Sequence, residues 1–175
     1  SLLVVAISGG ARGETGLVCE DGDADRYVLP VPGTLVRAPW LGPHYAQFLT
    51  SFYELDHTPN DLDPRHVLGH VVDLLEAEGL TPVVAVELEF YLVDIEDGRT
   101  APAPGTVTGH RSTDIQVYGL REMEDLQPFF DELYSACDAQ DIPIESGISE
   151  FAPGQFEFTL RHKADALRAT DDAIM

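Results

Sequence analysis

Residues 83–94 read VVAVELEFYLVD, an apolar run that is interrupted by two glutamates, Glu87 and Glu89. Successive side chains of a β-strand point to opposite faces, so the run predicts a strand over residues 82–93 with one apolar face and both carboxylates on the other. Two carboxylates about 6.5 Å apart on one face repel each other by roughly 2.5 kcal/mol at an effective dielectric constant of ~20. Either water screens this repulsion or a cation removes it, and this strand alone leaves both explanations open.

A second segment repeats the pattern. Residues 149–160 read SEFAPGQFEFTL, and strand alternation places Glu157 on a polar face and the phenylalanines on the other. Glu150 lies seven residues earlier, before a turn that contains Pro153 and Gly154. If these strands join the first one in a single sheet, four carboxylates share one face. Mg²⁺ and Mn²⁺ prefer oxygen ligands, so such a face suits a two-metal site of the kind that organises phosphates.

Capping and turn residues divide the rest of the chain into an α+β pattern. Asp63 and Pro64 favour a helix start, apolar residues follow at helical spacing, and Gly79 favours its end. Residues 96–98 (EDG) predict a turn, and residues 99–120 predict a long loop. We expect helices over 63–79, 124–140 and 163–175, strands on both sides of 152–154, and a β-rich region over 1–60.

Composition excludes two classes of partner. Ten Lys and Arg against 31 Asp and Glu give a net charge of -21, which repels nucleic acid and anionic membranes, so we expect neither as a partner. Cys19 and Cys137 are far apart and fit neither a zinc site nor a disulfide framework, which predicts a cytoplasmic protein. The apolar run at residues 2–6 is too short to span a membrane. We expect Asp171 and Asp172 to be solvated helix charges.

The two acidic segments, VELEFYL (86–92) and SEFAPGQFEF (149–158), resemble the metal-ligand segments of the glutamine synthetase family. Three further stretches resemble its γ-glutamylpolyamine synthetase-like branch: LPVPGTLVRAPW (29–40), DPRHVL (63–68) and AQDIPIESGISEFAPGQFEFTL (139–160). The resemblance implies a partial β-grasp amino-terminal domain at 1–60. It also implies the first part of a catalytic domain at 61–175, an antiparallel sheet with flanking helices.

Such enzymes join ammonia or an amine to the γ-carboxylate of glutamate, which ATP first phosphorylates. By this resemblance, Glu89, Glu150 and Glu157 would ligate one Mg²⁺ or Mn²⁺ ion, near glutamate and the transferred phosphoryl group. Glu87 would help to hold a second ion, which bridges the ATP phosphates. These assignments give the four-carboxylate face a specific role.

The resemblance also implies a nucleotide site and an assembly. Glu145 matches a position that lines the nucleotide site, and the segment around Phe158 would lie beside the adenine. Full-length members form homo-oligomeric rings with sites between subunits.

Two features depart from the family pattern. Ala6 and Val31 stand where the family has aspartates, and the aspartate aligned with Ala6 helps to bind the incoming amine. The sequence ends at DDAIM (171–175), before the segments that supply a metal-ligating histidine, substrate-binding arginines and the remaining metal carboxylate. We therefore expect a fragment that is inactive alone. The alternative is a non-catalytic metal-binding or regulatory paralogue that retains only the four-glutamate patch.

Overall fold

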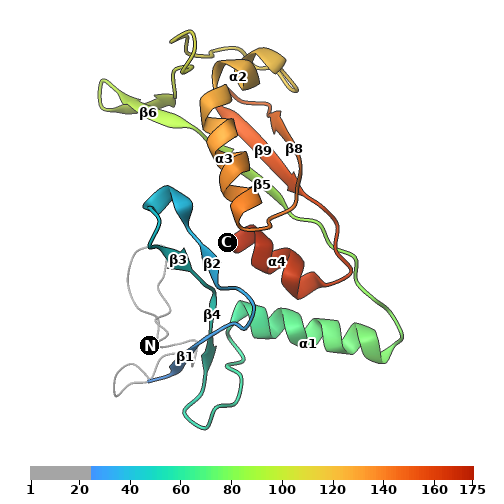
Figure 1. The fold of residues 1–175 in the computed structure, drawn as a ribbon. Coiled ribbons are helices and arrows are strands. Elements are labelled where there is room, and N and C mark those ends of the chain that lie inside the picture. The colour runs from blue at the N-terminus through green and yellow to red at the C-terminus, as the bar shows by residue number, and fades with distance from the viewer. Residues whose placement is uncertain (1–24) are drawn as a thin grey trace.

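The computed structural model describes residues 25–175, so Ala6, Cys19 and the apolar run at 2–6 lie outside the described residues. Helices and short antiparallel sheets alternate along the chain, which confirms the α+β class (Figure 1). The helices are α1 (Pro64–Ala77), α2 (Leu120–Asp125), α3 (Gln127–Ala139) and α4 (Ala166–Ile174), with a 3₁₀ helix at Pro39–Leu41. The strands are β1 (Tyr27–Pro30), β2 (Val36–Arg37), β3 (Ala46–Gln47), β4 (Thr50–Tyr53), β5 (Glu87–Tyr91), β6 (Val93–Glu96), β7 (Arg99–Pro102), β8 (Ile144–Ser149) and β9 (Gln155–Leu160).

The largest sheet has the strand order β5-β9-β8, and both of its pairs are antiparallel. Helix α3 lies across one face of this sheet (Figure 1). Phe130 from α3 packs there against Phe156 and Phe158 from β9, and the Phe90 ring from β5 stacks on Phe158 at 5.7 Å. Burying one such side chain stabilises the fold by about 1.5–3 kcal/mol. The aromatic cluster therefore fixes the sheet and, with it, the position of the opposite face.

Helix α1 begins and ends as the sequence predicts. Asp63 is buried, and its Oδ1 accepts hydrogen bonds from the backbone amides of Arg65 (2.9 Å) and His66 (3.3 Å). Its Oδ2 accepts a further bond from the backbone amide of Phe52 in β4 (2.8 Å). Gly79 follows the helix with φ of 74°, a conformation that glycine adopts without steric cost. One side chain thus caps α1 and ties it to β4.

Of three predicted element bounds, the structure confirms one and contradicts two. The turn at 96–98 is confirmed, because β6 and β7 form a hairpin around Asp97 and Gly98, which both have positive φ. The loop over 99–120 is wrong at its start, since residues 99–102 form β7. The single helix over 124–140 is also wrong. It is two helices that meet at Leu126, where Pro128 allows a new helix to start but not the continuous ladder of one helix.

Asp171 and Asp172 are buried, so the prediction that they are solvated is wrong. Asp171 pairs with Arg65 of α1 through two contacts of 2.9 and 3.1 Å, and this partner raises the pKa of Arg65. Asp172 is 3% exposed and pairs with both Lys163 and Arg168. These cations compensate the buried carboxylates, which would otherwise be strongly destabilising. The pairs join α4 to α1 and to the chain segment after β9.

Candidate functional site

The pairing register brings three of the four predicted metal ligands onto one face of the sheet. Glu89 of β5 lies directly opposite Glu157 of β9, and Glu87 lies opposite Thr159. Residues directly opposite each other in an antiparallel pair point to the same face. The assumption that these strands share a sheet is therefore confirmed.

Glu150 reaches the same face from the end of β8. Ile148 lies opposite Glu157, and strand alternation places Glu150 on the same side as Ile148. The backbone amide of Glu150 donates to the carbonyl of Gln155 at 2.8 Å, which continues the ladder one residue beyond β8. Glu87, Glu89 and Glu157 therefore share one face of the sheet, and the extended ladder places Glu150 at the edge of that face, one residue beyond β8.

The turn between β8 and β9 is held against β5. Gly154 has φ of 77°, and its carbonyl accepts a hydrogen bond from the backbone amide of Leu92 at 2.9 Å. A Cβ at this position would lie 3.0 Å from the carbonyl oxygen of Leu92. Glycine therefore meets two demands here, positive φ and a close approach of two backbones. The turn places Glu150 beside Gln155, at the end of the sheet where β5 ends at Tyr91.

Hydrogen bonds orient three of the carboxylates. Gln155 Nε2 donates to Glu89 Oε2 at 2.8 Å, and Thr159 Oγ1 donates to Glu157 Oε1 at 3.2 Å. The backbone amide of residue 151 donates to Glu150 Oε2 at 3.1 Å. Within residues 25–175, no ion pair joins any of the four glutamates to a basic side chain. Their mutual repulsion is therefore left to solvent or to an added cation.

The donor set fits a hard divalent cation in its chemistry. All four side chains offer oxygen, which Mg²⁺ and Mn²⁺ prefer, and Glu87 and Glu89 are exposed to entering ions. In the described part of the chain, however, no three His, Cys, Asp or Glu side chains lie close enough together to hold one ion. Binding at this face thus requires some of the long glutamate side chains to change rotamer so that three of them meet. The assignment of the four glutamates as ligands stays a prediction.

Glu145 and Phe158, the two predicted nucleotide-site residues, lie at different places. Glu145 is exposed at the irregularity of β8 between Ile144 and Ser146. Phe158 is 4% exposed and points away from the carboxylates, into the aromatic core. A nucleotide on the carboxylate face would therefore meet the backbone around residue 158 rather than its ring. Neither role has been tested, so both stay predictions.

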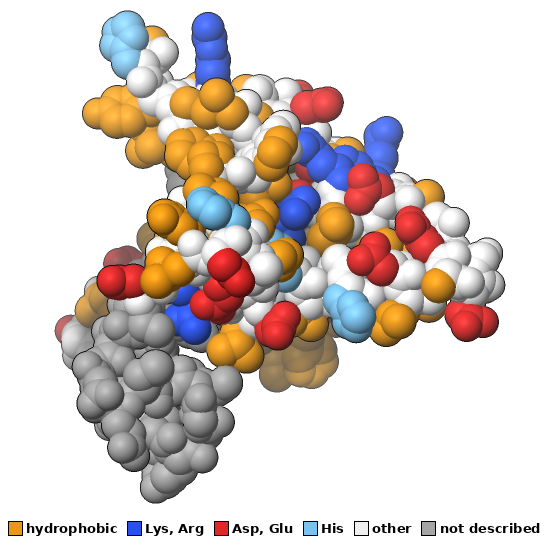
Figure 2. Space-filling view, turned by 90° about the horizontal axis from the view of Figure 1, so that it is seen from below, with side chains coloured by type: hydrophobic (Ala, Val, Ile, Leu, Met, Phe, Trp, Pro, Cys, Tyr) orange, Lys and Arg blue, Asp and Glu red, His pale blue; other side chains and the backbone are white. Residues whose placement is uncertain are grey.

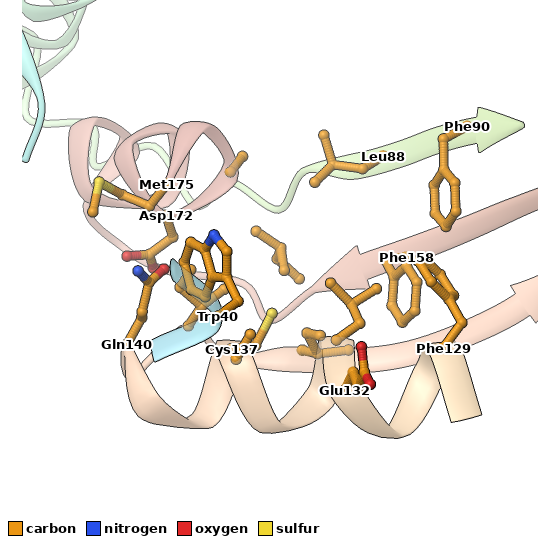
Figure 3. A pocket seen from close by; sticks show the side chains of 16 residues that line it. Trp40, Leu88, Phe90, Phe129, Glu132, Cys137, Gln140, Phe158, Asp172 and Met175 are labelled. Carbon is orange, nitrogen blue, oxygen red and sulfur yellow. The ribbon is translucent and has the colours of Figure 1, made fainter. Parts of the chain in front are cut away.

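An apolar cavity of about 490 Å³ lies on the Phe158 side of the sheet. Figure 3 shows Leu88 and Phe90 of β5 on one side of it and Cys137 of α3 on another. Burial raises the pKa of the Cys137 thiol, which keeps the thiol protonated. Because the sheet separates this cavity from the four glutamates, the cavity does not form part of the candidate metal site.

Sequence reasoning missed the roles of Gln155 and Thr159. Strand alternation places both on the polar face with Glu157, but it carries no information on hydrogen-bond partners. The Gln155–Glu89 contact follows from the register, which sets Gln155 opposite Tyr91 and two residues from the Glu89–Glu157 pair. The Thr159–Glu157 contact is local, because these residues are neighbours on one face of β9. The available signal was the polar side chains at every second position of residues 155–159.

Surface charge is dispersed over the face shown in Figure 2, where acidic side chains alternate with hydrophobic ones. This fits the strongly acidic composition. None of the helices within residues 25–175 has the length and apolar character needed to cross a membrane.

Comparison with known proteins gives consistent matches. Residues 61–175 match the model of the family described as glutamine synthetase, catalytic domain. The chain is 35% identical, over 99% of its length, to γ-glutamylputrescine synthetase PuuA of Escherichia coli K12, of which it covers 38%. It is 28% identical, over 86% of its length, to the glutamine synthetase of Thermotoga maritima, of which it covers 33%.

Solved structures agree with the sequence matches. The chain superposes on a glutamine synthase homolog with a TM-score of 0.69 at 25% identity, over 86% of this chain and 33% of that one. It superposes on GmaS without ligand with a TM-score of 0.72 at 22% identity, over 90% of this chain and 35% of that one, which shows a shared fold. The chain thus spans between a third and two fifths of the length of the relatives it matches.

Proposed function

The chain belongs to the glutamine synthetase family, and from this premise we propose that it forms the metal-binding part of an ATP-dependent ligase. The reaction joins ammonia or an amine to the γ-carboxylate of glutamate through a γ-glutamyl phosphate. The observation that carries the proposal is the register that sets Glu89 opposite Glu157 and places Glu87 on the same face. The resemblance predicted from the two acidic segments is confirmed at the level of the family.

The proposed reaction has two displacements. An oxygen of the glutamate γ-carboxylate attacks the γ-phosphorus of ATP and ADP leaves. The amine nitrogen then attacks the acyl carbon, phosphate leaves, and the nitrogen loses a proton. Both steps bring anions together, so both require charge neutralisation.

The four glutamates of this chain would hold the metal ions that neutralise these anions. We assign Glu89, Glu150 and Glu157 to one ion and Glu87 to a second ion, with Mg²⁺ or Mn²⁺ as the metal. Bound there, the ions would offset the charge on the carboxylate and on the transferred phosphoryl group. The aromatic core behind the sheet holds the strands in register, so the carboxylates start from fixed backbone positions.

The same proposal extends to the nucleotide and to the assembly. Glu145 and the backbone around Phe158 would contact ATP, and the complete protein would form a homo-oligomeric ring in the cytoplasm. The E. coli relative at 35% identity is by its name a γ-glutamylputrescine synthetase, which favours a polyamine as the acceptor.

A segment exchange tests this function, because the chain aligns over 99% of its length with the E. coli relative. We would replace the matching segment of that enzyme by this chain and measure phosphate release from ATP with glutamate and putrescine or ammonia. We expect release that requires Mg²⁺ or Mn²⁺ and an amine.

The matched control is the same exchange carrying Glu157→Gln, which keeps the size of the side chain and removes its charge. We expect at least a 100-fold lower rate from this control, since a carboxylate ligand is lost. An exchange protein that assembles normally but releases no more phosphate than the control would refute the ligase proposal. It would favour the non-catalytic alternative.

A further inference from the structure

Gln155 makes a contact that neither its strand position nor its side-chain type requires. It is the first residue of β9 and lies opposite Tyr91, yet its Nε2 donates to Glu89 Oε2 at 2.8 Å. The bond therefore runs diagonally across the strand pair to a carboxylate that lies two positions from Tyr91. Glu89 itself is exposed and has no basic partner within the described chain.

The other end of the same amide is also fixed. Gln155 Oε1 accepts a hydrogen bond from the backbone amide of Ala152 at 3.1 Å, and the backbone amide of Gln155 donates to the Ala152 carbonyl at 2.9 Å. Because the amide oxygen is held by the turn, the NH₂ group is the part directed at Glu89. The orientation of this amide follows from the hydrogen bonds at both of its ends.

The turn that holds Gln155 also carries Glu150. Its Gly154 carbonyl is bonded to the Leu92 amide of the segment after β5, so the turn cannot move independently of β5. Gln155 thus connects Glu89 on β5 to the turn that follows Glu150. The backbone amide of Glu150 donates to the Gln155 carbonyl at 2.8 Å, so Glu150 is joined to Gln155 as well, through the backbone.

We propose that Gln155 is a positioning residue for the cation site: its amide fixes one oxygen of Glu89 and leaves the other oxygen directed at the ion. This inference rests on the proposed function, because it assumes that Glu89 ligates a metal. Carboxylate ligands are commonly held by hydrogen bonds from outside the coordination sphere, and removal of such a partner typically lowers metal affinity about 10- to 100-fold. A neutral donor suits this role because it orients the carboxylate without neutralising its charge.

The test compares Mn²⁺ affinity of the chain with that of a Gln155→Met variant, by calorimetry. Methionine keeps the approximate length and volume of glutamine but neither donates to Glu89 nor offers the amide oxygen that accepts from Ala152. We expect the variant to bind Mn²⁺ about 10- to 100-fold more weakly. The melting temperature in the absence of metal should fall only slightly, because water can replace the acceptor of the half-buried Ala152 amide. The matched control is Gln127→Met, at an exposed glutamine that starts α3, and it should leave the affinity unchanged.

A spectroscopic measurement distinguishes a changed orientation of the Glu89 carboxylate from a loss of fold stability. The electron paramagnetic resonance spectrum of bound Mn²⁺ reports the symmetry of its ligands, so we expect Gln155→Met to change the line shape at saturating metal. A general loss of structure would instead lower the melting temperature and the number of bound ions.

The outcomes distinguish this inference from the proposed function. If the unmodified chain binds Mn²⁺ and Gln155→Met binds it with the same affinity and line shape, the positioning role is wrong and the metal site stands. If the unmodified chain binds no Mn²⁺ at millimolar concentration, the metal assignment fails, and the role of Gln155 fails with it.

Discussion

Glu89 and Glu157 face each other across two strands and have no compensating cation among the described residues. Like charges directly opposite in an antiparallel pair destabilise a sheet by an amount comparable to other cross-strand pairs, about 0.2–1 kcal/mol. Solvent keeps this penalty small, because Glu89 is exposed. A cation bound between the two carboxylates would remove this repulsion.

The first prediction uses this penalty. Glu157→Gln should raise the free energy of unfolding of the metal-free chain by about 0.5 kcal/mol, because it removes one of two opposed charges. The hydrogen bond from Thr159 is retained, since the amide oxygen of glutamine also accepts. Urea denaturation with and without Mn²⁺ measures the effect.

In the same experiment, Mn²⁺ should stabilise the unmodified chain and leave Glu157→Gln almost unaffected. Glu76→Gln, at an exposed position of α1, serves as the control and should respond to Mn²⁺ like the unmodified chain. A Glu157→Gln chain that is less stable without metal would contradict the reading of this pair as repulsive.

At the residue scale, sequence alternation correctly gave the face on which Glu87, Glu89 and Glu157 lie. It did not give the direct opposition of Glu89 and Glu157, because register depends on the pairing of segments more than 60 residues apart. The same limit explains why the contact between Gln155 and Glu89 was not predicted. Alternation describes residues within one strand, whereas the Glu89–Glu157 and Gln155–Glu89 contacts join two strands that are distant in the sequence.

Asp63 serves two elements at once, capping α1 and accepting from β4. The second prediction is that Asp63→Ala lowers the free energy of unfolding by about 2–3 kcal/mol. Loss of a cap costs about 1 kcal/mol, and an unpaired backbone amide adds a further 1–2 kcal/mol. Denaturation with urea measures the change.

Asp61→Ala is the matched control, because Asp61 is exposed and lies two residues before the cap. It should change stability by less than about 0.5 kcal/mol. Equal effects of the two substitutions would show that Asp63 acts only through local charge.

Asp125 of α2 holds the segment after β7 through hydrogen bonds to Thr108. Its carboxylate accepts hydrogen bonds from the Thr108 hydroxyl at 2.6 Å and from the Thr108 backbone amide at 2.7 Å. These donors hold the pKa of Asp125 below its ordinary value of 3.8. A carboxylate with a lowered pKa stabilises the folded form above its ordinary pKa, and this contribution disappears as the pH falls through the folded value.

The third prediction follows from the lowered pKa of Asp125. The Thr108 amide resonance should stay constant from neutral pH to about 4 and shift below 3.8, as Asp125 becomes protonated. Asp125→Ala should give the released Thr108 signal at neutral pH already, whereas Asp131→Ala, at an exposed site on α3, should not. A Thr108 signal that is the same in all three proteins at pH 7 would contradict this anchor.

At the element scale, capping and turn residues correctly predicted where elements begin and end. Asp63, Pro64 and Gly79 gave both ends of α1, and the EDG turn gave the β6–β7 hairpin. The break at Leu126 was missed, because apolar residues continue at helical spacing across it. Periodicity shows which face is buried but does not exclude a change of axis within the pattern.

At the scale of the whole molecule, polar contacts between distant segments join the parts of the chain. Gln140 at the end of α3 donates to the carbonyl of Arg37 at 3.0 Å and accepts from Gln47 at 3.3 Å. Asp171 joins α4 to α1 through Arg65. The sequence suggested solvated charges at 171–172, because a pair of aspartates on a short helix carries no sign of its distant partners.

The assignment of residues 1–60 to a partial β-grasp domain and of 61–175 to a catalytic domain stays a prediction as a division of this chain. The family match over residues 61–175 coincides with the second of these ranges. Helix α1 starts just inside that match, and the capping contact between Asp63 and Phe52 crosses the expected boundary. The two parts are therefore expected to unfold together.

The proposed function requires that Glu87, Glu89, Glu150 and Glu157 bind divalent cations. Its most direct test is a calorimetric titration of the 175-residue chain with Mn²⁺, beside a chain that carries both Glu89→Gln and Glu157→Gln. We predict saturable binding to the unmodified chain, competed by Mg²⁺, and at least a 100-fold loss of affinity in the double variant, which lacks two ligand charges. Equal affinity in the two proteins, or no saturable binding to the unmodified chain, would contradict the account.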